Sequence, residues 1–124
     1  MEIRLAKTAG FCFGVDRAVQ MTRRLLDAGE KVATLGPLIH NPQVVAELEA
    51  RGAKVAASPA GVPPGYKVVI RSHGVPRSVY GELEALGIPW ADATCPFVPK
   101  FHAIARRAEQ EGTCLGVAGD AANP

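Results

Sequence analysis

The sequence predicts an α/β fold with a mostly parallel sheet that is flanked by helices. Short β-prone runs alternate along the chain with segments whose apolar residues recur at helical spacing. The run at 66–70 is apolar almost throughout, which is typical of a parallel strand buried on both faces. Because parallel strands are joined by right-handed crossovers, we expect the helices to cover the sheet. A glycine follows each expected helix: Gly29, Gly52, Gly87 and Gly112.

The individual elements follow from the same signals. The expected strands lie at 3–5, 31–35, 54–57, 66–70, 88–91 and 114–118. The expected helices begin at Val15, Pro42, Pro76 and Phe97 and end before those glycines. Asn41 and Pro42 are a strong helix start, because asparagine caps free backbone N–H groups and proline suits the first helical position. The last helix is expected to bury a side that contains Phe97, Phe101 and Ile104.

Length and composition are those of one ordinary globular domain. The chain has 124 residues, of which 48% are hydrophobic and 21% are charged. It contains no apolar run that could span a bilayer and no signal-peptide pattern, so we expect a cytoplasmic protein with no membrane segment. A net charge of +2, spread along the chain, argues against a nucleic-acid partner and is compatible with a small anionic ligand.

The three cysteines are an odd number without paired spacing, so they do not suggest a disulfide framework. Cys12 stands between Gly10 and Gly14, at the expected turn from a strand into a helix. The positive end of a helix dipole favours the thiolate, which attacks electrophiles or binds metals. The alternative is a buried cysteine that packs as a small apolar side chain. Cys114 begins the last expected strand and is expected to lie in the core.

Thiols and polar side chains follow five of the expected strands. They are Cys12, His40, His73, Thr94 with Cys95, and Asn123. Because ligands of parallel sheets bind beside the carboxyl ends of the strands, we expect these residues to form one site. Taken singly, each has an ordinary explanation as well. The histidines could be hydrogen-bonded loop residues, Thr94 could cap a helix, and Asn123 could be a turn residue.

Local spacing alone does not decide the chemistry of this site. No Cys-x-x-Cys or His-x-x-x-His spacing suggests a zinc ion, and residues 10–14 do not match the Gly-x-Gly-x-x-Gly dinucleotide motif. Cys12 as a nucleophile with His40 as its base has suitable residue types but no local signature. The residues therefore leave both a metal-binding thiolate and a cysteine nucleophile open.

Four motifs follow one another along the chain. They are Gly-Phe-Cys-x-Gly-Val-x-Arg-Ala at 10–18, Gly-Pro-x-x-His-Asn at 36–41, Ser-His-Gly at 72–74 and Asp-Ala-Thr-Cys-Pro at 92–96. Together they resemble the 4-hydroxy-3-methylbut-2-enyl diphosphate reductase family, which catalyses the last step of the methylerythritol phosphate route to isoprenoids. The resemblance covers the whole chain but only the first part of the family's usual length. It implies a trefoil of three similar α/β domains around an iron–sulfur cluster, with residues 1–95 as the first domain and 96–124 as the opening segment of the second.

The resemblance also implies roles for single residues. Cys12 and Cys95 match two of the family's three cysteines that hold a 4Fe-4S cluster, and His40 and His73 match its diphosphate-binding histidines. In that family, reductive removal of the substrate's hydroxyl as water yields isopentenyl and dimethylallyl diphosphate. The implied partners are a small anionic diphosphate substrate and an electron-donor protein such as ferredoxin or flavodoxin.

The chain departs from the family's pattern near residue 124. The family usually carries His-Pro-Glu in a second-domain loop, whereas this chain has Asn123 and Pro124. Asn123 can still hydrogen-bond the substrate, but the proton-relay glutamate and the third cysteine do not occur in these 124 residues, so no catalytic acid is assigned. We therefore expect the complete protein to be the reductase and this chain by itself to be inactive. The alternative is a non-redox module of the same descent that binds a phosphorylated ligand or another subunit.

Overall fold

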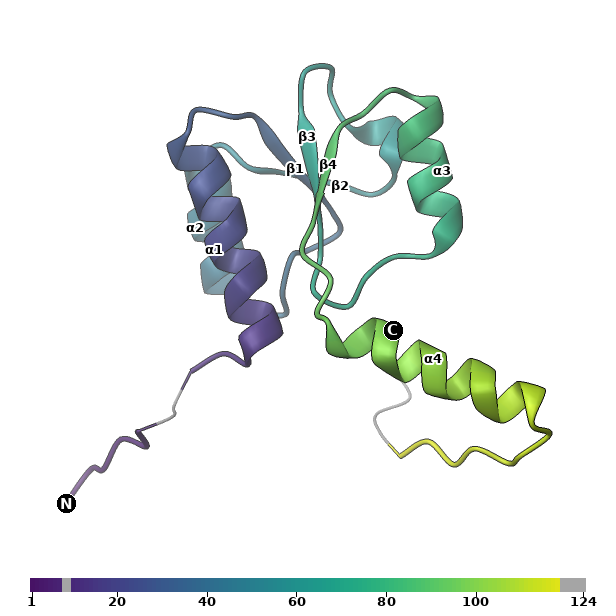
Figure 1. Ribbon diagram of the computed structural model, residues 1–124. Coiled ribbons are helices and arrows are strands. Elements are labelled where there is room, and N and C mark those ends of the chain that lie inside the picture. Colours follow the sequence, from purple (N-terminus) through teal and green to yellow (C-terminus); the bar gives the residue numbers. More distant parts are fainter. Residues whose placement is uncertain (8–9, 119–124) are drawn as a thin grey trace.

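The computed structural model describes residues 1–7 and 10–118 (Figure 1). Within these residues the sheet has four strands in the order β2-β1-β3-β4, and every neighbouring pair is parallel. The strands are β1 (Val32–Leu35), β2 (Lys54–Ala56), β3 (Lys67–Ile70) and β4 (Trp90–Asp92). The predicted α/β fold with a parallel sheet is confirmed.

Helices cover both faces of the sheet, as Figure 1 shows. On one face lie α1 (Phe13–Asp27) and α2 (Pro42–Ala50), and on the other lie α3 (Arg77–Ala85) and the short 3-10 helix η1 (Pro59–Gly61). The remaining helix, α4 (Phe97–Gln110), lies beyond the end of β4 (Figure 1). None of the helices among the described residues is both long and apolar enough to cross a membrane.

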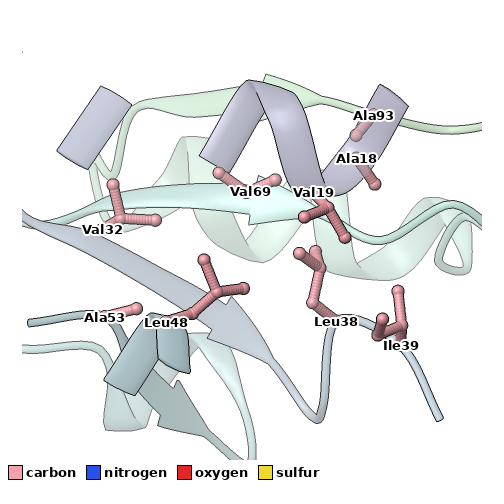
Figure 2. Close-up of a cluster of buried hydrophobic side chains, with 9 residues drawn as sticks. All are labelled: Ala18, Val19, Val32, Leu38, Ile39, Leu48, Ala53, Val69 and Ala93. Carbon is pink, nitrogen blue, oxygen red and sulfur yellow. The ribbon is translucent and has the colours of Figure 1, made fainter. Parts of the chain in front are cut away.

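The sheet separates two hydrophobic clusters, because successive side chains of a strand point to opposite faces. The cluster on the side of α1 and α2 includes Val19, Val32, Leu48 and Val69 (Figure 2). The cluster on the side of α3 includes Ala33, Val68, Ile70 and Leu83. The alternation within β3 explains why its sequence is apolar almost throughout, since both of its faces are covered.

Two of the predicted strands do not form. Residues 1–7 contain no strand, and the side chains of Ile3 and Leu5 are 82% and 87% exposed. Residues 113–118 also have neither helix nor strand, and Cys114 is exposed instead of lying in the core. The predictions of these two strands and of a buried Cys114 are therefore wrong. A β-prone run becomes a strand only where a neighbouring backbone pairs with it, and no strand in the described ranges does so.

The predicted buried side of the last helix is exposed. α4 has no buried residue, and Phe97, Phe101 and Ile104 are 65%, 49% and 58% exposed. Their spacing does form an apolar stripe along the helix, but burial needs a partner surface, and α4 covers neither face of the sheet. The prediction that this stripe is buried is wrong for the described fold. The division into a domain at 1–95 and a second one from 96 stays a prediction.

Candidate functional site

The loops after β1, β3 and β4 lie at the same edge of the sheet, because these strands are parallel neighbours. His40 follows β1 and His73 follows β3. The centroids of the two imidazole rings are 5.7 Å apart, with an angle of 34° between the ring planes. The structure therefore brings together two histidines that are far apart in the sequence.

The His40 loop is anchored on both sides of the histidine. Leu38 and Ile39 are buried in the cluster beneath α1 (Figure 2). On the other side, Asn41 Oδ1 accepts hydrogen bonds of 3.1 and 3.2 Å from backbone N–H groups in the first turn of α2. The predicted helix cap is thereby confirmed. His40 itself is exposed, so a fixed backbone presents a solvent-accessible imidazole.

Cys95 packs against the first turn of α1. A Cβ atom on the buried Gly14 would lie 2.8 Å from both the Cβ and the Sγ of Cys95, so only glycine leaves room for the thiol. Cys12 is the N-cap residue of the same helix. Both cysteines therefore lie near the N-terminus of α1, with Cys12 exposed and Cys95 half-buried, and neither forms a disulfide.

Hydrogen bonds hold the Cys95 loop against its neighbours. Arg17 Nη1 of α1 donates to the carbonyl oxygen of Thr94 at 3.0 Å. The backbone N–H of Cys95 donates to the carbonyl oxygen of Ser72 at 2.9 Å, and that of Thr94 donates to Asp92 Oδ1 at 2.8 Å. Sequence reasoning missed the roles of Arg17 and Asp92. Their position within two of the four motifs was the available signal.

Asp92 is a carboxylate held by several donors. In addition to the backbone N–H of Thr94, the hydroxyl of Tyr80 donates to Asp92 Oδ2 at 2.9 Å. Burial by itself raises the pKa of this carboxyl, but the hydrogen bonds from Thr94 and Tyr80, together with the charge of Arg17, hold the pKa of Asp92 below its usual value. Asp92 therefore stays charged and keeps the turn before Cys95 in place.

His73 lies in surroundings that disfavour a proton on its ring. Burial lowers the pKa of this imidazole below its ordinary value, and the charges of Arg71 and His40 lower the pKa further. Its Nδ1 atom is buried and has no hydrogen-bond partner among the described residues. The ring is therefore neutral at pH 7 unless an anion binds beside it and favours protonation.

The outcome differs for the two remaining predicted residues, Thr94 and Asn123. Thr94 does not cap α4, whose N-cap residue is Pro96 and has no side-chain capping bond. Asn123 lies outside the described residues. Within residues 1–7 and 10–118, no three side chains of Cys, His, Asp or Glu are close enough to hold one metal ion. A metal centre on Cys12 and Cys95 would need a further ligand.

Comparison with known proteins decides the family. The family model described as LytB protein matches residues 3–124. This chain belongs to the LytB family. It is 45% identical over 124 residues to the 4-hydroxy-3-methylbut-2-enyl diphosphate reductase of Geotalea uraniireducens (strain Rf4) and 40% identical over 125 residues to that of Clostridioides difficile (strain 630). These alignments include 100% of this chain but 44% and 45% of the relatives, so it spans less than half of their length.

Solved structures of LytB relatives have the same fold. A structure of (E)-4-hydroxy-3-methyl-but-2-enyl diphosphate reductase matches with a TM-score of 0.73 and 41% identity, over 89% of this chain and 39% of that one. The reductase of Plasmodium falciparum matches with a TM-score of 0.75 and 27% identity, over 85% of this chain and 33% of that one. The family resemblance found in the four motifs is confirmed.

Gly14→Ala is expected to lower the free energy of unfolding of this LytB chain. The new Cβ would overlap Cys95, which costs about 1–3 kcal/mol, whereas the gain in helix propensity is only about 1 kcal/mol. Urea unfolding followed by circular dichroism measures the change. Gly81→Ala in α3 is the matched control, because nothing lies within 4 Å of its Cβ position, and it is expected to stabilise the chain. Two stabilised variants would contradict the close contact between Gly14 and Cys95.

Proposed function

We propose that this chain is the N-terminal part of an iron–sulfur reductase. The complete protein would reductively dehydroxylate (E)-4-hydroxy-3-methylbut-2-enyl diphosphate to isopentenyl diphosphate and dimethylallyl diphosphate in the methylerythritol phosphate route. One observation supports this most strongly. In a LytB-family fold, the Cys95 loop packs against the helix whose N-cap residue is Cys12. The rings of His40 and His73 lie 5.7 Å apart at the same edge of the sheet.

A 4Fe-4S cluster is the proposed cofactor, with Cys12 and Cys95 as ligands. Thiolates are the side chains that hold such clusters, and Cys12 is the N-cap residue of α1. The space that Gly14 leaves for the thiol of Cys95 supports the same assignment. A third cysteine is expected from another part of the protein. When bound, the cluster supplies electrons and a Lewis-acidic iron.

His40 and His73 are the proposed contacts for the diphosphate group. Two rings 5.7 Å apart can donate to neighbouring oxygens of one diphosphate. Because the pKa of His73 is lowered in the free protein, its ring would take up a proton as the anion binds. Asn123 is proposed as a further hydrogen-bonding residue. An electron donor such as ferredoxin or flavodoxin and a cytoplasmic location stay predictions.

His40→Ala and His73→Ala are each expected to weaken binding of inorganic pyrophosphate. Removing one hydrogen bond to a charged group costs about 1.5–3 kcal/mol, which corresponds to a loss of about 10- to 150-fold in affinity. Isothermal titration calorimetry on the 124-residue chain measures this loss. Lys31→Ala is the control, because it removes a positive charge just before β1, at the opposite edge of the sheet. If all variants bound pyrophosphate with equal affinity, neither histidine would contact the diphosphate, and both would be ordinary loop residues.

A non-redox module that binds a phosphorylated ligand is the second candidate function. The presence of Asn123 where the family usually has a histidine favours it, because an amide cannot supply the charge of an imidazolium. The colour of the complete protein distinguishes the two candidates. An iron–sulfur protein purified without oxygen is brown, whereas a module without a cluster is colourless.

A further inference from the structure

The loop at 93–95 follows one face of α1 toward the N-terminus of that helix. Its three residues are matched with helix residues that lie progressively nearer to this end: Ala93 shares a buried cluster with Ala18 (Figure 2), Thr94 accepts from Arg17, and Cys95 packs against Gly14. Cys12 is the N-cap residue at the same end of α1. The path of the loop therefore leads the thiol of Cys95 toward Cys12.

The apolar contacts along this path do not fix the register of the loop on the helix. Gly14, Ala18 and Ala93 are all buried and small, so they allow the loop to approach the helix closely. Contacts between such residues have no preferred direction. Because each helical residue advances about 1.5 Å along the axis, a slip of one residue would move Cys95 by about that distance relative to Cys12.

The hydrogen bond of Arg17 does have a direction. Its Nη1 atom donates to the carbonyl oxygen of Thr94 at 3.0 Å and joins two residues that are 77 positions apart. Within the described ranges, no other hydrogen bond connects α1 with residues 93–95. A charged donor forms a stronger bond than a neutral one. Arg17 is therefore the polar contact that sets the register.

The other side of the same peptide segment is held as well. The backbone N–H of Thr94 donates to Asp92 Oδ1 at 2.8 Å, and the hydroxyl of Tyr80 donates to Asp92 Oδ2 at 2.9 Å. A cation from α1 and an anion at the end of β4 thus bind the two polar backbone groups of Thr94. The residue directly before Cys95 cannot rotate without breaking one of these bonds.

We propose that Arg17 is a positioning residue, which fixes the register of the Cys95 loop on α1 and thereby the separation of Cys12 and Cys95. This role rests on the proposed iron–sulfur function, in which these two cysteines are ligands of one cluster. Arg17 would act through the backbone of Thr94, without a contact to the substrate.

Iron release from a chimaeric reductase tests this role. In the chimaera, this chain replaces the matched 44% of the Geotalea uraniireducens enzyme. Arg17→Met keeps a long side chain but removes the donor. It is expected to release iron to a chelator about ten-fold faster than the unchanged chimaera and to alter the EPR spectrum of the reduced cluster. Arg17→Lys retains a charged donor, so its release rate is expected to lie closer to that of the unchanged chimaera.

Two further variants of α1 separate positioning from charge and from helix stability. Arg24→Met makes the same charge change on the same helix, but Arg24 forms no hydrogen bond to residues 93–95 in the described structure. Gln20→Gly weakens the helix through its propensity, because Gln20 is exposed. Both variants are expected to leave the EPR spectrum of the cluster unchanged.

Alkylation of the 124-residue chain is a second readout, which needs no cluster. Cys95 is half-buried, whereas Cys12 is exposed. Arg17→Met is expected to raise the rate of iodoacetamide alkylation at Cys95 by about ten-fold, as the loss of one hydrogen bond to a charged group predicts. The rate at Cys12 is expected to stay unchanged. Mass spectrometry of the separated peptides measures each cysteine.

Equal iron release and equal EPR spectra of Arg17→Met and Arg24→Met would overturn the proposal, as would equal alkylation rates at Cys95 in these two variants. Faster iron release without a spectral change, matched by Gln20→Gly, would show that Arg17 only stabilises the helix and would overturn it too. A chimaera of unchanged sequence that binds no iron would instead overturn the proposed reductase function, and the role of Arg17 with it.

Discussion

Cys95→Ser is expected to remove the cluster and the activity together from a chimaeric reductase. In this chimaera the present chain replaces the matched 44% of the Geotalea uraniireducens enzyme. A serine hydroxyl is a poor ligand for the iron of a cluster. Substituting a residue that only contacts a metal ligand lowers metal affinity or activity by about 10- to 100-fold. Losing a direct ligand is therefore expected to lower turnover by at least about 100-fold. Anaerobic iron and sulfide analysis with a turnover assay measures both effects, and Cys12→Ser is expected to behave in the same way.

The chain contains its own matched control for this experiment. Cys114 is also a free cysteine, but it is exposed beyond the end of α4, so Cys114→Ser is expected to keep both iron and turnover. Undiminished iron and activity in Cys95→Ser would refute its assignment as a ligand. Fast and selective alkylation of Cys12 by iodoacetamide, combined with full activity of an iron-free protein, would favour the cysteine nucleophile instead.

The 124-residue chain by itself is expected to retain far less iron than one 4Fe-4S cluster per chain. The described residues bring Cys12 and Cys95 to one helix end but no third side chain that could join them on a metal ion. Two thiolates leave much of a cluster open to solvent and chelators. Anaerobic reconstitution, followed by gel filtration and iron counting, measures the retained iron. The chimaera, treated in parallel, should retain the full amount and show turnover.

The position of Cys114 makes this second prediction easy to contradict. Its thiol lies in a segment without helix or strand, so no sheet holds it away from the other two cysteines. A full cluster that is lost in Cys114→Ala would identify Cys114 as the third ligand. A full cluster that survives this substitution would show that two cysteines are sufficient.

Local sequence signals predicted most of the sheet and helices correctly. The apolar run at 66–70 became β3 because both of its faces are covered. Asn41 and Pro42 started α2 because the asparagine oxygen accepts from the first free N–H groups of the helix. These signals act within one helical turn or one strand, so residues close together in the sequence are sufficient to specify such an element.

The same signals failed at both ends of the described chain. Residues 3–5 and 114–118 were predicted as strands, yet no strand among the described residues pairs with them. The apolar stripe of α4 was predicted from its spacing, but it remains exposed because no described surface covers it. Residue propensity and apolar spacing indicate which secondary structure a segment favours. Whether a strand forms or a helix face is buried depends on the other elements that pair or pack with it.

For the candidate site, the sequence by itself determined the family, the residue types and the loops in which they lie. Only the tertiary structure decided which of these residues meet. The 5.7 Å spacing of His40 and His73 depends on the parallel pairing of β1 with β3. The contact of Gly14 with Cys95 depends on the packing of α1 beside the loop after β4. Each of these contacts joins residues that are dozens of positions apart in the sequence. Local propensity does not predict such contacts, because they form only when the strands pair and the helices pack against the sheet.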